Sequence, residues 1–149
     1  DSKDKAELGD LNVLVEEVLN VETPSERIIT FHPGECVKIP LRHVAVRRAL
    51  ANLVQNAIRY TTEEIEVFTG MEKDHAFFIV SDRGAGIPEA DIERLFQPFT
   101  QGDTARGTEG SGLGLAIIKR IVDTHGGNVV LSNIAEGGLQ AKVCLPLKF

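Results

Sequence analysis

Three segments with helical periodicity alternate with short β-prone segments, and the β-prone segments occur in pairs joined by glycine-containing turns. The two clearest pairs are 64–69 with 76–80, and 128–132 with 139–145 across Gly137-Gly138. Short turns join antiparallel strands, whereas parallel strands require a crossover of a dozen residues or more. The order of elements therefore predicts an α+β two-layer sandwich, in which three helices cover one face of a mixed, mostly antiparallel sheet.

The three helices are predicted from apolar residues that recur every three or four positions. The first begins after Asp10, a good N-cap, and ends before Pro24. The second spans 42–60, and the third spans 113–125 and ends at Gly126-Gly127.

The remaining segments are predicted from local composition. Residues 1–9 are polar and are expected to form a linker. Two strands, 27–31 and 36–39, are expected to pair around a His-Pro-Gly turn, and residues 70–74 supply the next turn. A short helix is expected over 88–96.

Composition limits the class of protein. A chain of 149 residues with 42% hydrophobic content has room for one domain. Its net charge of -6 argues against a nucleic-acid partner, which requires clustered basic residues. Two cysteines suit neither a zinc site nor a disulfide scaffold. No apolar run is long enough to span a bilayer, and no direct membrane contact is expected. A cytoplasmic location is expected.

Polar residues suited to a metal nucleotide follow one stripe of the second predicted helix. The helical period places Asn52, Asn56 and Arg59 on this stripe, and Tyr60 adjoins it. An amide oxygen suits Mg²⁺, a guanidinium suits phosphate and an aromatic ring suits a base. The alternative is that the paired asparagines simply face solvent.

Two glycine-rich segments could complete such a site. Asp82 ends a predicted buried strand, where its carboxylate could accept a hydrogen bond from an exocyclic amine, and Gly84 and Gly86 would let a flat ligand approach. Residues 110–115 place glycines directly before a helix, where free N–H groups favour phosphate. The alternatives are an ordinary strand-to-helix turn and a flexible linker. Neither segment fits the Rossmann or Walker pattern.

Taken in order, four motifs resemble the nucleotide-binding boxes of the GHKL superfamily (gyrase, Hsp90, histidine kinase, MutL), and within it the bacterial sensor histidine kinases. These are the N box at 52–60, the G1 box at 82–86, the F box at 96–99 and the G2 box at 110–115. The segment around the F box is similar to the subgroup of the osmosensor EnvZ, although Gln101 stands where that subgroup would carry a basic residue.

The resemblance implies a Bergerat fold with an ATP-binding catalytic domain over 10–149 and an ATP lid over 97–112. It implies that Asn56 binds Mg²⁺, and that Asn56, Arg59 and Arg106 take part in catalysis. The positions that it implies for ATP binding are Asn52, Asn56, Arg59, Tyr60, Asp82, Gly84, Gly86, Ile87, Phe99, Gly110, Ser111, Gly112, Leu113 and Gly114.

The resemblance also implies a reaction class. The ATP-hydrolysing relatives carry a glutamate four residues before the metal-binding asparagine, where it acts as a general base toward water. This chain has Asn52 there, so the γ-phosphoryl group is expected to pass to a histidine on a separate dimerisation domain, and from there to a response regulator.

The four histidines of this chain lack the sequence surroundings of a phosphoacceptor and are expected to be surface or capping residues. The alternatives are a nonenzymatic ATP-sensing module, a GHKL ATPase and a protein-serine kinase. The parent protein is expected to be an inner-membrane sensor kinase.

Overall fold

The computed structural model describes residues 5–35, 38–84, 88, 111–135 and 137–147. Within these residues, the elements are three helices and seven strands. In chain order they are β1 (Ala6–Asp10), α1 (Leu11–Glu22), β2 (Ile29–His32), β3 (Lys38–Arg42), α2 (His43–Tyr60), β4 (Ile65–Glu72), β5 (His75–Asp82), α5 (Ser111–Thr124), β6 (Asn128–Asn133) and β7 (Leu139–Pro146).

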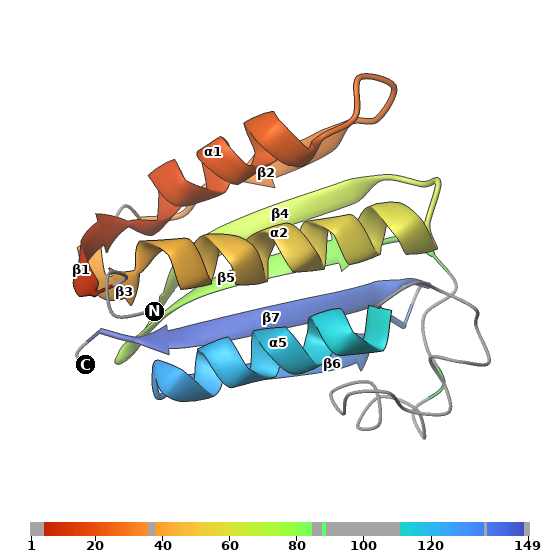
Figure 1. The fold of residues 1–149 in the computed structure, drawn as a ribbon. Helices are drawn as coiled ribbons and strands as arrows, with labels where there is room; N and C mark the ends of the chain where they lie inside the picture. Colours follow the sequence, from red (N-terminus) through yellow and green to blue (C-terminus); the bar gives the residue numbers. More distant parts are fainter. Residues whose placement is uncertain (1–4, 36–37, 85–87, 89–110, 136, 148–149) are drawn as a thin grey trace.

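Five strands form the main sheet in the order β2-β4-β5-β7-β6. The pair β2–β4 is parallel, and the other three pairs are antiparallel. The three helices lie on one face of this sheet, as Figure 1 shows. The predicted two-layer α+β sandwich with a mixed, mostly antiparallel sheet is therefore confirmed.

The helices form where apolar periodicity and capping predict them. The Asp10 carboxylate accepts hydrogen bonds from the backbone N–H groups of Asn12 (2.9 Å) and Val13 (3.4 Å), which confirms the predicted N-cap of α1. At the other end of the chain, Gly126 takes a φ of 74° after α5, and Gly127 N–H donates to the carbonyl of Val122 at 3.0 Å. A left-handed residue of this kind ends many helices, and glycine adopts it without a steric penalty.

The hydrophobic core fills the space between the helices and the sheet. The apolar stripes of the three helices meet the inward side chains of β4, β5 and β7, which alternate between buried and partly exposed positions. Fully buried members of this core include Val15 of α1, Leu50 of α2, Ile118 of α5 and Phe78 of β5. This packing fixes α2 and α5 side by side over the sheet.

Two expectations for the first third of the chain are wrong. Residues 6–9 do not form a linker, because they belong to β1, which pairs antiparallel with β3. The strands around the His-Pro-Gly turn do not pair with each other, because β2 instead pairs in parallel with β4, across the crossover through α2. Both pairings are nonlocal, so the local pattern did not reveal them.

Other boundaries differ by a few residues. The turn expected over 70–74 is shorter, because β4 continues through Glu72 and the chain reverses at Lys73, whose φ is 47°. Helix α5 begins at Ser111 rather than at residue 113. The closing hairpin of β6 and β7 is confirmed. Of the helix expected over 88–96, all but Pro88 lies outside the described residues, and Pro88 itself is not helical.

Candidate nucleotide-binding site

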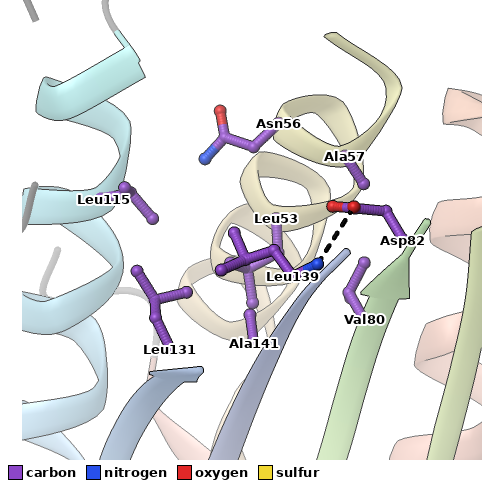
Figure 2. Close-up of a pocket in the computed structure, with 9 residues that line it drawn as sticks. All are labelled: Leu53, Asn56, Ala57, Val80, Asp82, Leu115, Leu131, Leu139 and Ala141. Carbon is purple, nitrogen blue, oxygen red and sulfur yellow. Dashed lines mark hydrogen bonds between the residues drawn. The ribbon is translucent and has the colours of Figure 1, made fainter. Parts of the chain in front are cut away.

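A pocket opens between α2, α5 and the ends of β5, β6 and β7, and we refer to it as the α2–α5 pocket. The empty space in it, open solvent included, amounts to about 360 Å³. Its lining residues are Leu53, Asn56, Ala57, Val80, Asp82, Leu115, Leu131, Leu139 and Ala141 (Figure 2). Seven of these nine side chains are apolar, so the walls suit a flat, weakly polar group, and Asn56 and Asp82 supply the polar contacts.

The Asp82 carboxylate is held rigidly at the end of β5. Only 5% of the residue is exposed, and Oδ1 accepts hydrogen bonds from the backbone N–H groups of Gly84 at 2.8 Å and Leu139 at 3.2 Å. Among the described residues, both hydrogen bonds to this carboxylate end on Oδ1. The second oxygen, Oδ2, is therefore left to accept a hydrogen bond from a ligand in the pocket.

The Asn56 amide projects from α2 toward α5 (Figure 2), and Asn56 lines the same pocket as Asp82. Its Oδ1 accepts a long hydrogen bond of 3.5 Å from Arg59, and its Nδ2 is buried without a hydrogen-bond partner among the described residues. Because an unsatisfied buried polar group costs about 1–3 kcal/mol, such groups occur mainly where a ligand or water completes them. The amide is therefore poised for a polar ligand, whichever of its two atoms faces inward.

The first turn of α5 lies close to the same pocket. The helix begins at Ser111, one turn before Leu115, which lines the pocket. The first four N–H groups of a helix have no partner within it, and the helix dipole makes this end electropositive. An anionic group extending from the pocket toward the start of α5 would meet these donors.

The predicted site residues divide into three groups. Asn56 and Asp82 both line the pocket, and the N–H of Gly84 donates to Asp82. Asn52 and Arg59 are not among the residues that line the α2–α5 pocket, although Arg59 contacts Asn56. At five predicted positions the structure describes the backbone alone: Tyr60, Ser111, Gly112, Leu113 and Gly114. Five others lie outside the described residues: Gly86, Ile87, Phe99, Arg106 and Gly110.

Sequence patterns alone did not reveal the apolar walls of the pocket. Leu115, Leu131, Leu139 and Ala141 follow the same periodicity as core residues, so the pattern gives no reason to separate them. A site role for Leu139 could have been suspected from the sequence, because it directly follows Gly137-Gly138. It is the one wall residue among these four whose backbone also touches the Asp82 carboxylate.

Two of the four histidines, His32 and His125, contact other residues through their ring nitrogens. His125 is buried, and its Nε2 accepts a hydrogen bond from the backbone N–H of Arg42 at 3.1 Å, while Nδ1 lies 2.8 Å from the carbonyl oxygen of Ile121. It therefore joins the end of α5 to the start of α2 and is not a surface residue. His32 lies 2.9 Å from Glu66 on the side of the sheet away from the helices.

Within the described ranges, no three His, Cys, Asp or Glu side chains are grouped to hold a metal ion. In the same part of the chain, no helix has the length and apolar composition needed to cross a membrane.

Curated relatives of this chain are sensor kinases. The circadian input-output histidine kinase CikA of Synechococcus elongatus is 36% identical over 148 residues, which cover 97% of this chain and 18% of CikA. The sensor histidine kinase CpxA of Escherichia coli is 41% identical over 105 residues, which cover 69% of this chain and 23% of CpxA. The chain thus spans less than a quarter of the length of either relative.

Solved structures show the same fold. The histidine kinase domain of the E. coli osmosensor EnvZ is 40% identical, with a TM-score of 0.76, over 96% of this chain and 89% of that one. The catalytic domain of the histidine kinase ThkA is 29% identical, with a TM-score of 0.83, over 97% of both chains. These likenesses confirm the predicted Bergerat fold and the resemblance to sensor histidine kinases.

A family model agrees with these relatives. The model described as "Histidine kinase-, DNA gyrase B-, and HSP90-like ATPase" matches residues 42–149, a range that contains every residue of the α2–α5 pocket. The chain therefore belongs to the family of histidine kinase-, DNA gyrase B- and HSP90-like ATPase domains.

Proposed function

We propose that this chain binds Mg-ATP in the α2–α5 pocket and donates the γ-phosphoryl group to a histidine on a separate dimerisation domain of a sensor kinase. The observation that carries the proposal is that one apolar pocket is lined both by a buried carboxylate, Asp82, and by the amide of Asn56, whose buried Nδ2 has no partner among the described residues. Histidine kinase relatives supply the reaction class.

The adenine ring would lie between the apolar walls. Asp82 Oδ2 would accept a hydrogen bond from the exocyclic amine of the base, because Oδ1 is already occupied by two backbone donors. The triphosphate would then extend past Asn56 toward the start of α5, where free N–H groups stabilise negative charge. Tyr60, Gly86, Ile87 and Phe99 are proposed as further contacts to the nucleotide.

Asn56 fits a magnesium site of the kind that nucleotides share with proteins. Mg²⁺ retains several waters and is usually held by one or two protein oxygens together with substrate phosphates. A single neutral amide beside a triphosphate fits that pattern, and the bound ion would neutralise phosphate charge. We propose that Arg59, whose guanidinium contacts Asn56, holds a phosphate oxygen, and that Arg106, in the proposed ATP lid over 97–112, acts in the same way.

Transfer of the phosphoryl group needs no base from this chain. An imidazole nitrogen of the acceptor would attack the γ-phosphorus, the bond to the ADP oxygen would break, and ADP would leave. Asn52 has an amide that cannot take a proton, so attack by water is not assisted at this position. We also propose that the phosphoryl group passes from the histidine to a response regulator and that the domain is located in the cytoplasm. Both follow from the chain's resemblance to sensor kinases.

The proposal is tested by mixing the chain with γ-labelled ATP, Mg²⁺ and a separately prepared dimerisation domain. We expect acid-labile label on the histidine of that domain and none on this chain. The Asn56→Ala variant should stay folded, because the amide makes no buried hydrogen bond to the core, and it should lose transfer together with Mg-ATP binding. Binding without transfer would instead indicate an ATP-sensing module, and steady phosphate release without an acceptor would indicate an ATPase.

A further inference from the structure

The β6–β7 turn touches the backbone and the side chain of Asp82, and this contact was not anticipated from the motifs. Leu139 N–H donates to Asp82 Oδ1 at 3.2 Å (Figure 2), and Leu139 also lines the α2–α5 pocket. The ladder between β5 and β7 pairs residues up to Ser81 with Gln140. Beyond this pair, the N–H of Leu139 in β7 donates to the Asp82 side chain and not to a backbone carbonyl of β5.

Gly138 packs directly against the same residue. A Cβ at this position would overlap the carbonyl oxygen of Asp82 and would lie 2.9 Å from its carbonyl carbon and 3.0 Å from the Cα of Arg83. Gly138 also has a φ of 118°, and its carbonyl accepts a hydrogen bond from Ile134 N–H at 2.9 Å. Only glycine allows the turn to approach β5 this closely while keeping the backbone in this conformation.

We propose that Gly138 and Leu139 are positioning residues that set the orientation of the Asp82 carboxylate, and through it the selectivity for the base. The reasoning rests on the proposed function, since it assumes that Asp82 reads an exocyclic amine. Gly138 fixes the distance between the β6–β7 turn and β5. The N–H of Leu139, together with that of Gly84, holds Oδ1 and so directs Oδ2 into the pocket.

The neighbouring glycine provides a matched control. Gly137 also has a positive φ, of 108°, so alanine at either position introduces a similar backbone strain. The nearest atom to a Cβ at Gly137 would be the carbonyl oxygen of Gly84 at 4.0 Å, which is an ordinary contact. The two variants therefore share the strain, and only Gly138→Ala displaces Asp82.

The experiment compares binding of ATP with binding of purine riboside triphosphate, which lacks the 6-amino group, to the wild-type chain, Gly137→Ala and Gly138→Ala. The wild-type chain and Gly137→Ala should prefer ATP by about tenfold or more, as expected for one charge-assisted hydrogen bond. In Gly138→Ala the preference should fall to about threefold or less, while binding of purine riboside triphosphate changes little. Thermal melting of each variant shows whether it is folded.

Equal preferences in folded Gly137→Ala and Gly138→Ala would overturn the inference. If Gly138→Ala does not fold, Leu139→Pro is compared with Leu139→Val at the first residue of β7, where proline is tolerated. Both variants shorten the side chain that lines the pocket, and only Leu139→Pro also removes the N–H donor. An equal preference for ATP in Leu139→Pro and Leu139→Val would likewise overturn it. A wild-type chain that binds neither nucleotide would instead refute the proposed function, so the two failures are distinguishable.

Discussion

Replacing Asp82 by asparagine isolates the one atom that is proposed to read the base. Asparagine keeps Oδ1, so the N–H groups of Gly84 and Leu139 retain their acceptor. The change puts an NH₂ group at the position of Oδ2, so that this group and the exocyclic amine of adenine, both hydrogen-bond donors, would face each other. Because the Oδ1 contacts persist, the free energy of unfolding should fall by only about 1 kcal/mol.

The expected loss of ATP affinity follows from one hydrogen bond. A hydrogen bond to a charged group contributes about 1.5–3 kcal/mol, which corresponds to about a 10- to 150-fold rise in the Kd for ATP. Isothermal titration calorimetry with ATP and with purine riboside triphosphate measures both constants. The Kd for the analogue should change by less than about threefold, because it has no amine to lose.

Two results would refute this reasoning. An unchanged Kd for ATP in folded Asp82→Asn would mean that the carboxylate does not contact the base. An equal loss for both nucleotides would mean that the substitution deforms the pocket and does not remove a specific contact.

Three further predictions concern residues outside the pocket. Arg27→Met should lower the free energy of unfolding by about 1–2 kcal/mol in urea titrations, because the guanidinium donates to three carbonyl oxygens at and just beyond the end of α2, and Arg27→Lys should restore only part of the loss. His125→Leu should cost about 1–3 kcal/mol, since it leaves the N–H of Arg42 without its acceptor, and a change below about 0.5 kcal/mol would contradict this. Burial raises the pKa of the Cys144 thiol above its ordinary value of 9.0, so in a Cys36→Ser background iodoacetamide should modify the native chain more slowly than the urea-unfolded chain at pH 8. Because the folded state holds this proton more tightly, stability should decrease as the pH rises above 9.0, and a flat profile there would count against the shift.

Local patterns predicted well the three helices and the two hairpins, β4–β5 and β6–β7. The stripe beginning at Leu11, the cap at Asp10 and the glycines after α5 each depend on residues close together in the sequence. For the same reason, the motif positions Asn56 and Asp82 could be named before their spatial relation was known. Their meeting across one pocket required the packing of α2 against β5, which no local pattern contains.

Nonlocal contacts account for the errors and omissions. Strand β1 is mostly exposed and has no clear alternation of apolar and polar residues, so only its pairing with β3 makes it a strand. The parallel partner of β2 lies beyond α2, and the turn at 32–34 gave a misleading local alternative. The contact of Gly138 with Asp82 joins residues 56 positions apart, so its role emerges only when the two are seen together.

The central claim is that Asn56, Asp82 and the start of α5 surround a single magnesium nucleotide. Calorimetry of the folded chain with ATP, in the presence and absence of Mg²⁺, tests it most directly. We predict saturable binding with one site per chain, strengthened by Mg²⁺ in the wild type but not in Asn56→Ala. Folded protein that releases no heat at millimolar ATP and Mg²⁺, and shows no thermal stabilisation there, would contradict the claim.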